Sequence, residues 1–296
     1  MKKLLLASVI SASMTLPVIA SAQSAPAAQS AHTFTGNLGL ASDYRFRGIS
    51  QTFKQPAIQG GFDYAHASGF YLGTWASNVT GSLANGPSYN NGNMEWDFYG
   101  GYKWEVAKDL GLDIGLLYYW YPGAQYANPQ KSKYNNLEAY LGVGYKWFSA
   151  KYSHGLTDYF GTRTDTYGAP FAGAAGYCGL LSDGATAGPN CAGASPGGSK
   201  ASGYLELNAN FEIAEKLTLG LHAGHQTVRH YSRFSYTDYK LSLTREWAGL
   251  NWTLAYVGTN ADKDWWRAVK NLGTGNGVNA KNPGEGALIV SVQKNF

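Results

Sequence analysis

Large apolar residues occupy almost every second position of NMEWDFYGGYKW, residues 93–104. Successive side chains of a β-strand point to opposite faces, so this alternation predicts a strand with one apolar and one polar face. The polar face carries Glu95, Asp97 and Lys103. The apolar face carries Met94, Trp96, Phe98, Tyr102 and Trp104. A strand with so many aromatic residues on one side needs an extended apolar environment there.

The same alternation recurs in twelve segments of the chain. They are residues 34–46, 58–66, 70–79, 94–104, 110–120, 137–147, 150–159, 203–213, 217–225, 239–247, 250–258 and 286–296. Asp113, Glu206 and Glu212 fall opposite the apolar positions of their segments, which places them on the polar side. Two registers stay open, because 70–79 is apolar on both faces and one register of 150–159 turns His154 toward the apolar side.

The connections between these segments alternate between short and long. The short ones are residues 67–69, 105–109, 148–149, 214–216 and 248–249, and the long ones include 80–93, 121–136, 161–202 and 259–285. An even number of strands with short turns at one end and long loops at the other is the pattern of bacterial outer-membrane barrels. A soluble β-sandwich would alternate too, but would not sort its connections by length.

Composition points to the same fold class. Charged residues make up 14% of the chain, against about 25% in a typical soluble domain. No apolar run after the N-terminus approaches the roughly 18 residues that a membrane helix needs. A closed barrel is the sheet that can lie in lipid, because it leaves no strand edge unpaired. We therefore predict an all-β, transmembrane antiparallel β-barrel of about 12 strands over residues 34–296, with 161–202 as a long extracellular loop.

The first 22 residues read as a secretory signal peptide. Lys2 and Lys3 precede an apolar run, and Ala20-Ser21-Ala22 forms a small-residue cleavage site; a transmembrane anchor is the less favoured alternative. Residues 23–33 would then be an N-terminal periplasmic leader. Loss of the two lysines brings the formal net charge of +4 closer to zero, so no nucleic-acid partner is indicated.

The C-terminus carries a second localisation signal. The chain ends ALIVSVQKNF, with Leu288, Val290, Val292 and Phe296 on one side of a strand. A terminal aromatic residue closing an amphipathic strand resembles the signature by which the barrel assembly machinery recognises outer-membrane proteins. The expected surroundings are outer-membrane lipid and lipopolysaccharide.

Residues 42–79 resemble the opening of a known family. The segments SDYRFRG (42–48), PAIQGG (56–61) and GFY (69–71) are similar to those of the TorF-type outer-membrane porin family, also named Gcw_chp. The layout of Tyr-, Trp- and Gly-rich strands ending in Phe extends the similarity over most of the chain. The resemblance implies a small-solute pore and brings no settled substrate or site residue.

The first segment places charges in the predicted lumen. If Leu38, Leu40, Tyr44 and Phe46 face lipid, then Asp43, Arg45 and Arg47 point inward. They could select small anions or zwitterions, or they could pair with Glu95, Asp97, Glu206 and Glu212 and simply fill the barrel. Inward Tyr99, Tyr119, Tyr140 and Tyr204 could stack on a solute or pack as filler. The pore-lining candidates are Asp43, Arg45, Arg47, Glu95, Asp97, Lys103, Asp113, Glu206 and Glu212.

A channel for passive diffusion of small hydrophilic solutes is the favoured function. A non-conducting structural or adhesive barrel is the alternative, and an outer-membrane lipid hydrolase is less favoured. Serine–histidine neighbours that could serve a hydrolase are Ser153 with His154, and His222 or His225 with Ser232 or Ser235. No nucleophile elbow accompanies them, so no catalytic residue and no cofactor is expected.

Cys178 and Cys191, both in the 161–202 loop, are expected to form a disulfide. The exported compartment is oxidising, and the loop offers no histidine and few carboxylates for a metal site. Mass spectrometry of a non-reduced digest of exported protein should find the two peptides linked. Two free thiols there would rule the bond out.

Overall fold

A computed structural model describes residues 30–80, 92–125, 131–163, 166, 197–263, 266, 268–269 and 280–296. Its long strands are β1 (His32–Ala41), β4 (Ala57–His66), β5 (Phe70–Asn78), β6 (Met94–Ala107), β7 (Leu110–Trp120), β8 (Asn136–Tyr145), β9 (Phe148–Gly155), β10 (Gly203–Ala214), β11 (Leu217–Thr227), β12 (Tyr236–Trp247), β13 (Leu250–Thr259) and β16 (Ala287–Asn295). The short elements are β2 (Arg45–Phe46), β3 (Ile49–Ser50), β14 (Ala268–Val269), β15 (Ala280–Lys281) and the 3₁₀ turns η1 (Tyr159–Gly161) and η5 (Ser232–Phe234).

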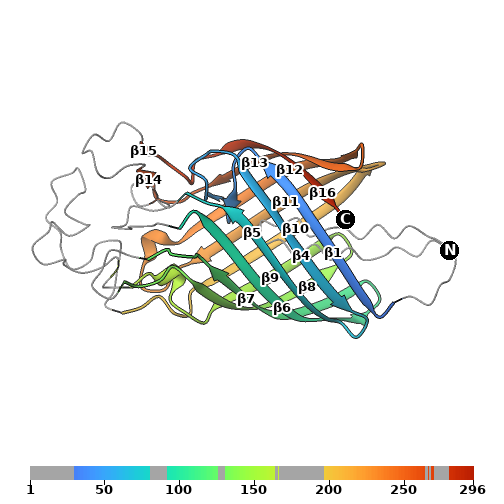
Figure 1. Cartoon of the computed structure of the whole chain (residues 1–296), viewed down its shortest axis with the longest axis horizontal. Coiled ribbons are helices and arrows are strands. Elements are labelled where there is room, and N and C mark those ends of the chain that lie inside the picture. The colour runs from blue at the N-terminus through green and yellow to red at the C-terminus, as the bar shows by residue number, and fades with distance from the viewer. Residues whose placement is uncertain are drawn as a thin grey trace, which may run out of the picture.

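The twelve long strands form one closed antiparallel barrel (Figure 1), which confirms the predicted fold class. Strands that follow one another along the chain pair with each other, and β1 closes the ring by pairing with both β4 and β16. The start of β1 and the C-terminus lie at one end of the barrel, and β14 and β15 lie beyond the other end. The predicted signal peptide, leader and cysteine pair lie largely or wholly outside the described residues.

The predicted sidedness is confirmed on β6, β7 and β10. On β7, the outward side chains of Ile114 and Leu116 are 46% and 51% exposed, whereas the inward side chain of Asp113, which precedes Ile114, is 6% exposed. β6 and β10 show the same division, with Glu95 and Glu206 almost completely buried inside the barrel. Among the described residues, no helix is long and apolar enough to cross a membrane. The barrel thus has a continuous apolar exterior and a polar interior.

Several strand boundaries differ from the prediction, and three of the differences concern the ends of β6, β8 and β9. The turn between β8 and β9 is at residues 146–147 rather than 148–149, with Lys146 at φ 52°. β9 ends at Gly155, so Tyr159 belongs to η1 and not to a strand. β6 extends to Ala107 through a bulge and shortens the turn before β7. Alternation marks a strand well but does not mark where a tight turn interrupts it.

The two open registers are resolved by the structure. On β5, Phe70 and Leu72 are exposed on the outer face, and Trp75 is buried inside. On β9, His154 follows the exposed Tyr152 on the outer face, with ring centroids 6.2 Å apart. His154 therefore belongs to the apolar side, and its neighbour Ser153 is buried on the inner side.

The last residue completes the closure between the first and last strands. The backbone of Phe296 donates to Gly36 and accepts from it, with N–O distances of 3.0 Å and 2.7 Å. The Phe296 ring covers Gly36, where any Cβ would lie 2.5 Å from Cε2 of the ring. Phe62 of β4 packs edge-on against the same ring, with centroids 6.3 Å apart.

At Gly101 of β6, the backbone of the neighbouring strand β7 approaches so closely that a side chain has no room. A Cβ at this position would lie 2.2 Å from the backbone oxygen of Ile114, so Gly101→Ala must displace β7. We expect a loss of about 1–3 kcal/mol, the usual cost of overpacking. The temperature at which the compact band of unheated protein converts to the unfolded band on a gel should fall. Gly144→Ala is the matched control, because nothing lies within 4 Å of its Cβ; equal shifts in both variants would contradict the argument.

Candidate functional site: a hairpin inside the barrel

The chain between β1 and β4 folds into the barrel instead of extending the wall. Residues 42–55, here named the luminal hairpin, contain β2 and β3, paired Arg45 with Ser50 and Phe46 with Ile49. Arg47 and Gly48 form the two-residue turn, with φ of 47° and 80°. Positive φ at both central residues is the pattern of a type I′ turn, which fits the twist of a tight hairpin. Arg47 takes this conformation without being glycine, at a cost of order 1 kcal/mol.

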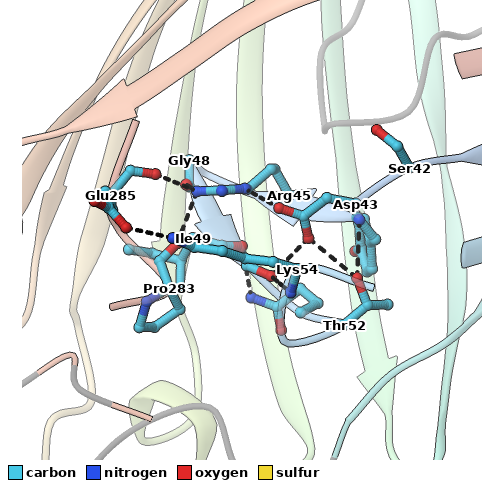
Figure 2. A network of polar contacts seen from close by, with 12 residues as sticks. Ser42, Asp43, Arg45, Gly48, Ile49, Thr52, Lys54, Pro283 and Glu285 are labelled. Carbon is cyan, nitrogen blue, oxygen red and sulfur yellow. Dashed lines mark hydrogen bonds and ion pairs between the residues drawn. The ribbon is translucent and has the colours of Figure 1, made fainter. Parts of the chain in front are cut away.

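Asp43 holds the base of the luminal hairpin together (Figure 2). Its Oδ1 accepts hydrogen bonds from Ser50 Oγ at 2.6 Å and Thr52 Oγ1 at 3.1 Å. Its Oδ2 forms an ion pair with Arg45 Nε at 2.6 Å. All four side chains are buried, so a single carboxylate neutralises Arg45 and closes the turn.

Arg45 then fastens the hairpin to the chain that precedes β16. Its Nη1 donates to the carbonyl oxygens of Gly48, Pro283 and Glu285 at 3.0, 2.7 and 3.0 Å (Figure 2). The Lys54 ammonium pairs with the Glu285 carboxylate. The hydrogen bond from Lys54 and its positive charge lower the pKa of Glu285. The contact is therefore present at neutral pH and is lost when the pH falls through this lowered pKa.

Arg47, at the tip of the hairpin, reaches the opposite wall. Its Nη2 pairs with Glu138 Oε2 of β8 at 2.6 Å, and its Nη1 donates to Gln226 Oε1 of β11 at 2.7 Å. The guanidinium lies over the rings of Phe46 and Tyr204, 4.7 and 4.2 Å from their centroids. β8 and β11 lie across the ring from β1 and β4, so the hairpin spans the lumen.

Aromatic residues of the hairpin pack inside the barrel, which corrects the prediction that Tyr44 and Phe46 face lipid. Tyr44 is 3% and Phe46 is 7% exposed. Tyr44 donates to Glu95 Oε1 at 2.7 Å, and its ring meets Trp75 edge-on. Phe46 packs edge-on against Tyr119 of β7. The prediction was wrong because the wall ends at Ala41, where the chain turns inward.

The other predicted pore-lining residues lie on the inner wall in different neighbourhoods. Glu95 accepts hydrogen bonds from Tyr44 and Tyr121. Asp97 is 0% exposed, and neither oxygen of its carboxylate has a hydrogen-bond partner among the described residues. In another part of the inner wall, Asp113 accepts a hydrogen bond from the Tyr71 hydroxyl at 2.7 Å, and the Lys103 ammonium lies over the Tyr71 ring.

Glu206 lies near Lys151, with Nζ 2.8 Å from Oε1, whereas Glu212 is exposed near the turn that follows β10. The contact between Lys151 and Glu206 is an ion pair without an aligned hydrogen bond, since neither oxygen of Glu206 has a hydrogen-bond partner in the described part of the chain. The predicted charges are therefore not one ring, and the arginines pair with Asp43 and Glu138 rather than with Glu95, Asp97, Glu206 or Glu212.

A small cavity lies beside the hairpin tip, and Lys151, Asp238 and Lys240 in its lining were not named in the prediction. Its volume is about 50 Å³. Besides the hairpin tip, its lining includes Lys151, Glu206, His222, Asp238 and Lys240. All of them except Asp238, which follows Thr237, lie between apolar residues in the sequence, so the same alternation could have placed them in the lumen. Their grouping around one cavity depends on the register of four neighbouring strands.

The histidine and serine pairs considered for a hydrolase do not come together among the described residues. His222 Nε2 lies 2.8 Å from Asp238 Oδ2 and its Nδ1 lies 2.7 Å from Asn208 Oδ1. His225 contacts Thr237 on the outer face, and Ser235 Oγ accepts from the backbone N–H of Val228.

The chain is similar to several solved porin structures. The KdgM porin in complex with disordered oligogalacturonate shares 9% identity over 89% of this chain and 98% of that chain, with a TM-score of 0.45. The NanC porin shares 8% over 88% and 98%, with a TM-score of 0.46. The outer membrane protein OprD from Pseudomonas aeruginosa shares 10% over 82% and 59%, with a TM-score of 0.34. A comparison with curated proteins found no match.

A family model described as a bacterial protein of unknown function (Gcw_chp) matches residues 25–296. The match confirms the family resemblance of residues 42–79 and extends it to nearly the whole chain. The TorF-type name and the pore function that the resemblance implied stay predictions. This protein belongs to the Gcw_chp family.

Proposed function

We propose that this protein is a porin-like channel of the bacterial outer membrane that passes small hydrophilic solutes, with the luminal hairpin narrowing its passage. The observation that carries the proposal is that the barrel wall has an apolar outer face and a polar inner face. Outward residues such as Leu116 and Leu241 are more than half exposed, and a continuous apolar belt of this kind fits a lipid environment better than water. The inner wall carries acidic and basic side chains around a cavity, which fits a water-containing lumen.

A lipid location also agrees with the backbone of the barrel. Each of the twelve wall strands pairs with a neighbour on both sides, so the closed wall has no strand edge that would face hydrocarbon unpaired. Outer-membrane lipid and lipopolysaccharide are the surroundings we propose, and Phe296 is the residue proposed for recognition by the assembly machinery. Export through a cleaved signal peptide belongs to the same proposal.

A non-conducting structural barrel is a second candidate, and the packing of the hairpin favours it. Tyr44 and Phe46 belong to one buried apolar cluster with Trp75 and Tyr119. Ile49 belongs to another, with Tyr231 and other residues of the loops. These clusters fill the lumen around the hairpin, so solute passage requires either a path beside the hairpin or its displacement.

Replacing the hairpin separates the two candidates. Ala41 and Ala57 are direct partners in the register of β1 and β4, so an Asn-Gly turn in place of residues 43–55 can join the strands. In planar bilayers we expect small conductance steps from the wild-type protein and several-fold larger steps from this variant, because the main obstruction is gone. Two folded, heat-modifiable proteins that both stay silent would support the structural barrel instead.

The paired arginines are expected to matter for stability more than for ion preference. Arg47→Met leaves the Glu138 carboxylate buried and uncompensated, a change that typically costs about 3–5 kcal/mol. The double variant Arg47→Met, Glu138→Gln should recover much of the lost stability. The single and the double variant should both show the same reversal potential in a salt gradient as the wild type. Lys216→Met, which removes an exposed pair with Glu246, is the control.

The unfolding temperature of the compact band on gels and the reversal potential measure the two effects separately. The opposite outcome is a double variant whose heat resistance is unchanged and whose reversal potential shifts strongly toward cation preference. That result would show that Arg47 controls ion selectivity rather than stability.

A further inference from the structure

Lys240 is an inward lysine that has no close ion-pair partner among the described residues. It lies on β12, opposite His222 of β11 and Val257 of β13, and it lines the cavity beside the hairpin tip. Among the described residues it has no hydrogen bond and no ion pair. Its ammonium is also not among the polar atoms that are completely buried without a partner. Lys240 therefore lines the cavity with an ammonium that protein atoms do not fully cover.

The other charged groups around this cavity are already engaged. Arg45 pairs with Asp43, Arg47 with Glu138 and Lys151 with Glu206. Asp238 accepts from Tyr204 at 2.9 Å and contacts His222 at 2.8 Å. Each of these positive charges has a carboxylate within ion-pair distance, and Lys240 does not.

Two carboxylates that line the cavity, Glu206 and Asp238, attract Lys240 electrostatically, but they are poorly placed to meet a solute. Glu206 is 1% and Asp238 is 2% exposed. Both oxygens of Glu206 are covered by protein atoms. A solute in the cavity would therefore contact the ammonium of Lys240 before it contacted a carboxylate, and the site would favour negative charge.

The size of the cavity limits the ligand. About 10–15 Å³ of such volume holds one water molecule, so about 50 Å³ accommodates a few waters or an anion of a few heavy atoms. Halides, formate and acetate meet this limit, whereas a sugar ring does not. An ammonium in a partly desolvated site attracts such an anion more strongly than it would in bulk water.

We propose that this cavity is a binding site for a small inorganic or carboxylate anion, with Lys240 as the residue that contacts it. In this position Lys240, rather than Arg45 or Arg47, sets the charge preference of the passage. Its role in transport rests on the proposed channel function, whereas anion binding at the cavity does not.

Bromide in crystals of the full-length barrel tests the binding directly. Anomalous scattering should place bromide in contact with Lys240 Nζ in the wild-type protein and in Lys240→Arg. Lys240→Met should lose this peak, and Lys216→Met, which removes a lysine from an exposed turn outside the lumen, should keep it. A wild-type cavity without bromide, or a peak that persists in Lys240→Met, would overturn the site.

Selectivity in planar bilayers tests the consequence for transport. In Lys240→Met the chloride-to-potassium permeability ratio should fall roughly fivefold at low salt, which corresponds to about 1 kcal/mol. The fall should be smaller at high salt, because ions screen the charge. An unchanged ratio in a conducting Lys240→Met barrel would contradict the role in selectivity. If the wild type does not conduct, the channel proposal fails while the bromide result still decides the site.

Discussion

Complete pairing of the backbone is the constraint on which this structure depends. Where strands are shielded from water, each N–H and C=O group needs a partner, and a closed ring supplies one for every strand. β1 provides the closure by pairing with β4 on one side and with β16 on the other. Phe296 extends the second pairing by two further hydrogen bonds to Gly36. Closure into one ring also divides the side chains of each wall strand between an inner and an outer face.

A closed wall of twelve strands leaves an interior that has to be filled. The luminal hairpin does so with aromatic residues and with two arginines, each held against a carboxylate. Buried charges of this kind are tolerated because they are paired and hydrogen-bonded. Arg47 has a strained conformation, with φ of 47°, in the turn of this hairpin, and from there its guanidinium binds Glu138. Pairing of these charges leaves Lys240 as the group available to a solute.

The number of strands and their sidedness were predictable from the sequence because both are local properties. An apolar residue at every second position, as in Met94–Tyr102, identifies the outer face of a strand without reference to any other segment. The polar residues between them, such as Asp97, then lie inside. Membership of the inner wall was equally predictable for Glu138 and Lys240, since both sit between apolar neighbours.

The sequence by itself therefore determined a barrel with an apolar outside and a charged inside, and the tertiary structure decided what the inside does. Tyr44, Arg45, Phe46 and Arg47 alternate as a wall strand would, yet they form a hairpin within the lumen. Their position depends on Pro283, which lies 238 residues from Arg45, and on Gln226, which lies 179 residues from Arg47. Contacts over such separations leave no periodic trace in the local sequence, because they exist only once the ring has closed.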